Sequence, residues 1–175
     1  MIYKNNVLIT VYITNYNYGN YLEQSINSVL NQSTKNFELI IIDDGSTDNS
    51  TEIINKFKNN SQIKFISQKN KGLNVSNNIA LKLSKGKYII RLDADDWLET
   101  RALELLSNHL ETNPDIGLVF ADYYTVNNSG QIIEEIRRHN FDDVTLLDKP
   151  AHGACTMIRT SCLKNIGGYD ESFKC

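Results

Sequence analysis

Three aspartates and a glutamate crowd together at the end of an apolar run, in the segment RLDADDWLE at residues 91–99. Carboxylates this close repel one another, and the only basic side chain in the segment is Arg91. A divalent cation such as Mg²⁺ or Mn²⁺ removes the repulsion, because both ions prefer oxygen ligands. Side chains two apart on a strand point the same way, so Asp93 and Asp95 are predicted to face one metal ion, with Asp96 beginning the turn beside them as a further ligand.

The small number of protein ligands predicted here favours a metal that is shared with a substrate. Mg²⁺ is commonly held by one or two carboxylates together with substrate phosphates, so a diphosphate is expected to complete the coordination shell. The alternatives are a calcium loop and a solvated helix start. A calcium loop of the EF-hand type spreads its acidic ligands over a longer loop, and that spacing is absent from this segment.

Aromatic and acidic side chains at the ends of two earlier apolar runs fit a nucleotide on that diphosphate. Tyr16 follows the first run closely enough to stack on a base. A uracil N3–H needs an acceptor, which the carboxylate of Asp43 or Asp44 supplies. Lys71 and Arg91 are candidates for contacts with phosphate oxygens. Taken singly, Tyr16 is equally compatible with an exposed surface aromatic, and the two cations with solvated side chains.

The chain that must position these side chains alternates between strand and helix patterns. Short apolar runs predict strands at 7–14, 37–43, 63–67, 87–93 and 116–122. Apolar residues at helical spacing predict a helix after each of the first four runs, at Leu22, Ile26, Val29 and Leu30, at Ile53, Ile54 and Phe57, at Val75, Ile79 and Leu83, and at Ala102, Leu103, Leu106 and Leu110. This alternation is typical of an α/β fold with a mostly parallel sheet covered by helices on both faces.

After Asp122 the pattern changes. The turn sequence NNSG at 127–130 predicts an antiparallel hairpin, and residues 154–159 are a further candidate strand. Three polar clusters, TNYNYGNY, DDGSTD and DADD, coincide with the ends of the first, second and fourth predicted strands. Each cluster alone is compatible with a turn or a helix cap. Together they favour one binding site, because ligands of such sheets bind beyond the carboxyl ends of the strands.

Composition and charge exclude several classes of protein. The 175-residue chain is one domain by size, and its net charge of −3 without a basic run argues against nucleic acid as the main partner. No run reaches the length of a transmembrane helix, and no signal-peptide cleavage site follows the apolar N-terminus. Cys155, Cys162 and Cys175 lack metal-ligand spacing, so reduced thiols and a cytoplasmic location are expected. The fingerprints of dinucleotide oxidoreductases and P-loop enzymes are also absent.

Four ordered segments resemble family 2 glycosyltransferases of the GT-A fold: VYITNYNYGNYLEQSINSVLNQS, FELIIIDDGSTDNS, NKGLNVSNNIALKLSKGKYIIRLDADDWLE and IGGYDESF. The resemblance covers nearly the whole chain and implies a Rossmann-like sandwich. It implies transfer of a sugar from a nucleotide-sugar donor, often UDP-linked, with inversion at the anomeric carbon and with Mn²⁺ or Mg²⁺ as cofactor. The acceptor is left open between a glycan, a lipid-linked glycan, a surface polysaccharide and a protein, and peripheral association with the inner face of a membrane is compatible with these acceptors.

The resemblance also implies roles for individual residues. Thr14 and Tyr16 would border the base, and Asp44 would accept from uracil. Asp93 would lie near the ribose, and Asp95 would be the main metal ligand of a DxD motif.

One departure from the family pattern concerns the segment after Gly72. Many members carry an arginine beside an asparagine there, and this chain has Asn77 in the arginine's place. A basic contact to the donor is therefore missing or comes from elsewhere, with Lys71 as the candidate.

The acceptor side is less well marked. His152, Asp122 and Trp97 are candidates for contacts there, although each is compatible with a structural role. Inverting transfer needs a general base, and a carboxylate is the usual choice. In the family this acid follows the Gly-Gly turn, which leaves Asp170 and Glu171 as the weaker candidates within the chain.

The expected organisation is a nucleotide-binding half at residues 1–98, followed by the start of an acceptor-binding half at 99–175. The base is expected beyond Cys175, so the acceptor half is expected to be truncated. Two other activities remain open at this point. One is a nucleotide-sugar-binding domain without transfer activity, and the other is a metal-dependent phosphatase, whose motif the DADDWL segment does not complete.

Overall fold

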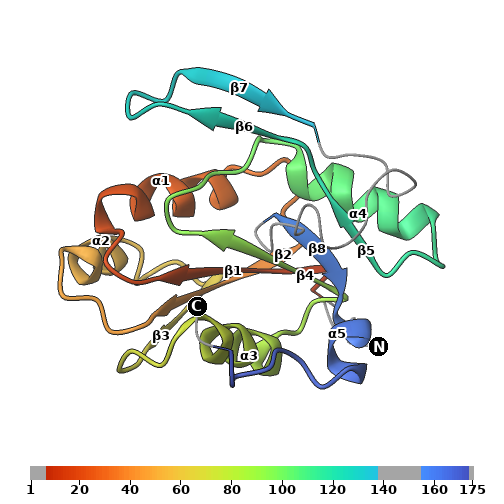
Figure 1. Ribbon diagram of the computed structural model, residues 1–175, viewed down its shortest axis with the longest axis horizontal. Helices are drawn as coiled ribbons and strands as arrows, with labels where there is room; N and C mark the ends of the chain where they lie inside the picture. The colour runs from red at the N-terminus through yellow and green to blue at the C-terminus, as the bar shows by residue number, and fades with distance from the viewer. Residues whose placement is uncertain (1–6, 138–154, 174–175) are drawn as a thin grey trace.

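A computed structural model describes residues 7–137 and 155–173 (Figure 1). The helices and strands alternate along the first two thirds of the chain, as the apolar pattern predicts. In chain order the elements are β1 (Ile9–Asn15), α1 (Gly19–Leu30), β2 (Phe37–Asp43), α2 (Ser50–Lys56), β3 (Ile63–Ser67), α3 (Leu73–Leu83), β4 (Tyr88–Asp93), α4 (Ala102–Thr112), β5 (Leu118–Phe120), β6 (Tyr123–Val126), β7 (Ile132–Ile136), β8 (Thr156–Arg159) and α5 (Thr160–Asn165).

The main sheet has six strands in the order β3-β2-β1-β4-β8-β5. Strand β2 runs parallel to β3 and β1, and β1 runs parallel to β4, whereas β8 runs antiparallel to both β4 and β5. Strand β8, which is the last strand in the sequence, therefore lies between β4 and β5, which both precede it. This is the mostly parallel α/β sheet expected from the sequence, with one inserted antiparallel strand.

Strand side chains alternate between the two faces of the sheet, and each face packs against its own helices. Ile9, Val11 and Ile13 of β1 belong to a core shared with α1 and α4. Tyr12, between them, faces the second core, which α3 and α5 cover. In Figure 1, α1 and α4 lie above the sheet and α3 lies below it. The sheet is therefore buried on both sides, which explains its continuous apolar strands.

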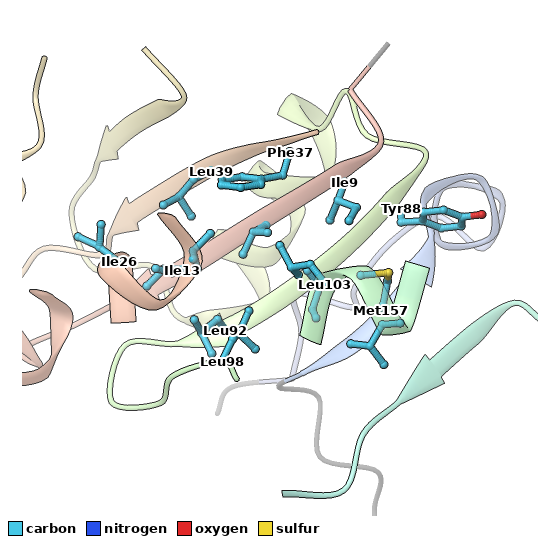
Figure 2. Packing of buried hydrophobic residues seen from close by; sticks show 14 of the residues in the cluster. Ile9, Ile13, Ile26, Phe37, Leu39, Tyr88, Leu92, Leu98, Leu103 and Met157 are labelled. Carbon is cyan, nitrogen blue, oxygen red and sulfur yellow. The ribbon is translucent and has the colours of Figure 1, made fainter. Parts of the chain in front are cut away.

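The larger core accounts for the helical spacing of apolar residues. Figure 2 shows Ile26 of α1 and Leu103 of α4 directed at the strand residues Ile9, Ile13 and Leu92. All five side chains are fully buried. Each such burial is worth roughly 1.5–3 kcal/mol relative to exposure. The apolar stripe of each helix, rather than its intrinsic propensity, therefore fixes it over the sheet.

Strands β6 and β7 form a separate two-stranded antiparallel ribbon, which confirms the predicted hairpin. Its turn closes with a hydrogen bond from the amide of Gly130 to the carbonyl of Asn127 (2.8 Å). The Asn127 side-chain oxygen also accepts from the amides of Ser129 and Gln131. Among the described residues, no helix is long and apolar enough to cross a membrane.

Candidate functional site

The carboxyl ends of β1, β2 and β4 lie side by side. Asn15 at the end of β1 is in register with Asp43 of β2, and Thr14 is in register with Asp93 of β4. The three polar clusters singled out in the sequence are therefore brought to one edge of the sheet. Because side chains alternate along a strand, the side chains at this edge lie on different faces of the sheet. Asn15 and Asp43 lie on the face covered by α1. Thr14 and Asp93 lie on the face covered by α3.

Asp43 is buried, with 5% of its surface exposed, and is held from two sides. Its Oδ1 accepts from Nδ2 of Asn15 (2.9 Å) and from the Ser46 hydroxyl. The Asn15 amide also donates to the Ser46 oxygen (3.0 Å). This triangle joins the end of β1 to the loop after β2, so part of Asp43's hydrogen-bonding capacity is used within the protein.

Asp44 ties the end of β2 to the loop before α3. Its Oδ1 accepts from Nε2 of Gln68 (2.7 Å) and from the amide of Lys71 (2.9 Å), and its Oδ2 accepts from the amide of Gly72 (2.8 Å). Although only 6% of the residue is exposed, Oδ2 accepts a single bond within the described residues. A carboxylate oxygen has two acceptor sites, so Asp44 can take one further donor.

The loop between β1 and α1 presents an aromatic side chain at the same edge. Asn17 adopts a left-handed conformation, with φ of 62°. Its side-chain oxygen accepts from the amide of Thr47 (2.7 Å), and its own amide donates to the Ser46 hydroxyl (2.9 Å). These bonds hold the preceding residue, Tyr16, with 47% of its surface exposed. Lys71 is also exposed, with its backbone rather than its ammonium group bound to Asp44.

Arg91 and Asp93 form an ion pair on β4. The distance from Arg91 Nε to Asp93 Oδ1 is 3.0 Å, and Nη2 donates to Oδ2 at 3.3 Å. The Nε–H does not point at the carboxylate, since Nε is buried without a hydrogen-bond acceptor among the described residues. The contact at Nε is therefore electrostatic, and the hydrogen bond comes from Nη2. The side chains are 12% and 29% exposed, which leaves the Asp93 carboxylate partly accessible.

The predicted alignment of Asp93 with Asp95 on one strand face is wrong. Strand β4 ends at Asp93, and the amide of Asp96 donates to the carbonyl of Asp93 (3.1 Å). This bond closes a turn that contains Asp95, so the pleat of the strand does not extend to it. Asp95 and Asp96 are instead exposed beyond the strand end. Within the part of the chain that the structure describes, the Asp95 carboxylate makes no hydrogen bond or ion pair to the protein.

The donor set at this turn fits a metal ion only if most ligands come from elsewhere. Among residues 7–137 and 155–173, no three acidic, histidine or cysteine side chains gather closely enough to form a metal cage. Asp95 and Asp96 are exposed oxygen donors, and Asp93 already carries a counter-charge. Such a set suits Mg²⁺ or Mn²⁺ that is completed by phosphate oxygens and water, and does not suit a cage made of protein ligands alone.

Asp48, the last acid of DDGSTD, has a structural role that the sequence did not reveal. It accepts from the amide of Gly19 (2.8 Å), from the amide of Ser50 (3.0 Å) and from the Ser50 hydroxyl. Desolvation alone would raise the pKa of Asp48, but the hydrogen bonds from Ser50 and Gly19 outweigh it and the pKa lies below its ordinary value. Asp48 thus holds the starts of α1 and α2 together. The sequence feature that could have indicated this role is the position of Asp48 two residues before Ser50, the first residue of α2, where a carboxylate can accept from backbone amides.

The candidate acceptor-side residues are only partly gathered. Trp97 is 38% exposed just beyond the turn at Asp95, and Asp122 is exposed after β5. His152 lies outside the described residues. Asp170 and Glu171 are exposed in the turn after α5.

The turn that carries these two acids runs along α3. Hydrogen bonds from the Ser172 side chain and amide lower the pKa of Asp170. The Glu171 carboxylate accepts from Nδ2 of Asn78 on α3 (2.8 Å). The structure therefore places both acids beside the helix whose N-terminal loop is bound by Asp44.

Curated proteins of similar sequence are named as glycosyltransferases or as chondroitin or hyaluronan synthases. The curated relatives include a chondroitin synthase of Pasteurella multocida, 38% identical over 127 residues that cover 72% of this chain and 13% of that protein. An uncharacterised glycosyltransferase of Methanocaldococcus jannaschii is 32% identical over 173 residues, covering 94% of this chain and 59% of that protein. The chain thus spans only a part of each relative's length.

Solved structures with the same fold carry nucleotides. TarS of S. aureus in complex with UDP superposes with a TM-score of 0.78 at 23% identity, over 95% of this chain and 51% of that chain. A mannosyltransferase of Pyrobaculum calidifontis in complex with GDP-Man and Mn²⁺ gives a TM-score of 0.72 at 18% identity, over 93% of this chain and 47% of that one. These likenesses establish the GT-A fold.

The family assignment comes from the sequence itself. The model of "Glycosyl transferase family 2" matches residues 10–167, a range that includes β1, β2, β4 and the turn beyond β4. The chain belongs to glycosyl transferase family 2.

Proposed function

We propose that this domain transfers a sugar, in the simplest case a hexose, from a UDP-sugar to a hydroxyl of an acceptor with inversion at the anomeric carbon. The observation that carries the proposal is the meeting of Asp44, with one open acceptor site, and the exposed acidic turn after β4 at one sheet edge. Relatives named chondroitin synthase and hyaluronan synthase, and a fold neighbour in complex with UDP-GlcNAc, support a nucleotide-sugar donor.

The donor's nucleotide is assigned to the edge formed by β1, β2 and β4. Asp44 accepts the uracil N3–H at the remaining site on Oδ2, and the exposed ring of Tyr16 stacks on the base. Thr14 borders the base and Asp93 faces the ribose, since the two are in register on adjacent strands. Asp43 supports this edge from the other face of the sheet, and Lys71 is an exposed cation of the loop bound by Asp44.

The residues that would hold Mn²⁺ or Mg²⁺ are Asp95 and Asp96, with Asp93 as a third oxygen donor beside Arg91. When bound, such an ion stabilises the negative charge that builds on the departing diphosphate. Exposure of the turn suits this role, because the diphosphate must reach the same ion. If the turn binds Mn²⁺ or Mg²⁺ with high affinity when no nucleotide is present, the assignment of a metal shared with the diphosphate is wrong.

The transfer step requires an acceptor hydroxyl opposite the diphosphate. The hydroxyl oxygen forms a bond to the anomeric carbon as the bond from that carbon to the diphosphate oxygen breaks, and a carboxylate takes the hydroxyl proton. Of the two acids in the turn after α5, Asp170 has a lowered pKa and is the weaker proton acceptor. Glu171 is therefore the better candidate within the described residues. Trp97, Asp122 and His152 are assigned to the acceptor side on the same proposal.

This assignment divides the chain into a donor-binding half and an acceptor-binding half. Residues 1–98 carry the donor site, and residues 99–175 contribute to the acceptor site. A glycan, a lipid-linked glycan or a growing polysaccharide is the proposed acceptor, reached in the cytoplasm or at the inner face of a membrane. The alternative of a nucleotide-sugar-binding domain without transfer is favoured by one observation, because both candidate acids are already hydrogen-bonded within the turn or to α3.

The proposal is tested by measuring UDP release from a panel of UDP-sugars, with GDP- and dTDP-sugars as comparisons, in Mn²⁺ and in EDTA. We expect UDP-specific binding that depends on the metal, and release of UDP that increases when a hydroxyl acceptor is added. Binding without release would establish the non-transferring alternative. Equal binding of all the nucleotide sugars would contradict the assignment of Asp44.

A further inference from the structure

Two asparagines on α3 hold the main chain of the turn that follows α5. Nδ2 of Asn78 donates to the carbonyl of Tyr169 (2.8 Å), and Oδ1 of Asn78 accepts from the amide of Tyr169 (2.9 Å). Nδ2 of Asn74 donates to the carbonyls of Asp170 (3.0 Å) and Phe173 (2.9 Å). The asparagines are four residues apart, so their side chains share one face of the helix. They fix the turn through its backbone, whatever side chains it carries.

The turn also approaches the helix too closely to carry a side chain at its start. A Cβ on Gly168 would lie 2.6 Å from Oδ1 of Asn78 and 3.3 Å from a methyl carbon of Leu81. The φ of Gly168 is +86°, a conformation that favours glycine. Glycine at this position therefore permits the close contact between the turn and Asn78.

A third attachment links the turn to the sheet. The hydroxyls of Tyr169 and Tyr12 are 3.4 Å apart, and Tyr12 is fully buried on β1. Burial and the neighbouring Tyr169 raise the pKa of Tyr12 well above its ordinary value. The turn is thus fixed to β1 as well as to α3.

One helix therefore connects two parts of the proposed site. The loop before α3 is bound by the Asp44 carboxylate through the amides of Lys71 and Gly72. The side of α3 holds the turn through Asn74 and Asn78. Asn78 also reaches the Glu171 carboxylate, to which Nδ2 donates at 2.8 Å.

We propose that Asn74 and Asn78 are positioning residues, which fix the turn at 169–173 as the acceptor-side wall of the transfer site. This inference rests on the proposed function. It requires that losing the asparagine contacts releases the turn and slows transfer, while UDP binding at the β1, β2 and β4 ends is kept. A purely structural role would instead weaken donor binding and transfer together.

The sharpest variant is Asn78→Asp. The substitution keeps the size of the side chain and an oxygen for the Tyr169 amide, but it loses both donated bonds and places a negative charge beside Glu171. Adding Glu171→Gln in the same chain supplies a new donor to that carboxylate and should restore part of the attachment. The control is Asn27→Asp on α1, where the asparagine is exposed and makes no side-chain hydrogen bond within the described residues.

Three measurements separate the outcomes. Hydrogen exchange of peptides that cover 166–173 reports the turn, calorimetry with UDP and Mn²⁺ reports the donor site, and UDP release in the presence of acceptor reports transfer. For Asn78→Asp we expect exchange in the turn to rise roughly tenfold and transfer to fall roughly 10- to 100-fold, with the UDP Kd within about twofold of the wild type. The double variant should return exchange toward the wild-type rate, and Asn27→Asp should match the wild type throughout.

The proposal is overturned if exchange in the turn is unchanged in Asn78→Asp, or if UDP affinity falls in parallel with transfer. If Asn78→Asp does not fold, Asn74→Ala tests the other half of the attachment, since it removes only the two bonds to the carbonyls of Asp170 and Phe173. Failure of the proposed function looks different. In that case the wild type neither binds UDP nor releases it, while the exchange data still report whether the asparagines hold the turn.

Discussion

The carboxylate of Asp44 accepts a hydrogen bond from the backbone amide of Gly72 at 2.8 Å, and this contact joins the end of β2 to the start of α3. The amide of Lys71 and the side chain of Gln68 complete the attachment. A buried negative charge is thus stabilised by protein donors while one acceptor site stays open. The same side chain therefore holds the loop before α3 and offers an acceptor to the uracil of the proposed donor.

Replacing Asp44 separates these two roles. In Asp44→Asn an amide group faces backbone donors, so we expect a loss of roughly 1–3 kcal/mol in the free energy of unfolding. UDP affinity should fall more than pyrophosphate affinity, because the acceptor for uracil N3–H is lost. Calorimetric titration with UDP, CDP and pyrophosphate makes the comparison, with Glu52→Gln on exposed α2 as the control. Undiminished preference for UDP over CDP in Asp44→Asn would show that Asp44 does not contact the base.

Removal of the exposed acid in the turn after β4 should abolish metal dependence. We expect Asp95→Asn to weaken UDP binding in Mn²⁺ to the level seen in EDTA, and to slow transfer by roughly 10²–10³, as for the loss of one strong electrostatic stabiliser. Asp115→Asn, an exposed aspartate before β5, is the matched control. If wild-type UDP affinity is the same in EDTA and in Mn²⁺, the metal assignment is wrong.

The ion pair on β4 should contribute to stability as a pair. Arg91→Met leaves the partly buried Asp93 carboxylate without a counter-charge, and we expect a loss of roughly 1–3 kcal/mol, less than for a fully buried pair. Adding Asp93→Asn removes the stranded charge and should recover part of the loss. Urea unfolding of the two single variants and the double variant gives the coupling. Strict additivity would mean that the two side chains do not interact.

Acid should selectively weaken the contact between α1 and α2. The pKa of Asp48 is lowered from its ordinary value of 3.8 by bonds from Ser50 and Gly19, which outweigh desolvation. A group whose pKa is lower in the folded state stabilises that state above its unfolded pKa, and the contribution disappears as the pH falls through the folded pKa. The difference in Tm between wild type and Asp48→Asn should therefore be largest near neutral pH and shrink below about pH 4. A pH-independent difference would contradict this origin.

Backbone crowding predicts a large effect at Gly86. A Cβ there would lie 2.4 Å from the amide nitrogen of Thr10 and 2.6 Å from the carbonyl oxygen of Tyr88. We expect Gly86→Ala to destabilise the fold by roughly 3 kcal/mol in urea unfolding, because backbone atoms cannot move aside as side chains do. Gly117→Ala, whose nearest contact would be Cys162 Sγ at 3.7 Å, is the control and should be close to neutral.

The sequence predicts the first four strands well because each is a continuous apolar run between polar ends. β2 is observed at Phe37–Asp43 and β3 at Ile63–Ser67, the ranges expected from the apolar pattern. The placement of β8 was not predictable. Its four residues, TMIR, carry no pattern that names β4 and β5 as partners, since pairing between distant segments depends on the whole sheet.

The candidate site was also predictable in part. The rule that polar clusters gather at the carboxyl ends of parallel strands correctly brought Asp44 and Asp93 to one edge. It did not give the turn that separates Asp95 from the strand, because the alternation of side chains holds only while the strand continues. The rule also did not predict the role of Asp48. That role depends on a donor that is distant in the sequence, the amide of Gly19.

The insertion of β8 between β4 and β5 has a consequence for the order in which the protein can assemble during synthesis. Strands β1 to β4 and their crossover helices are made first, but the outer edge of β4 has no neighbour until residues 156–159 leave the ribosome. An unpaired strand edge is a template for association with other chains. Closure over so long a separation is also slow, because the entropy of the intervening loop opposes it. Nascent chains that end before Arg159 should therefore aggregate more readily than chains that have passed it.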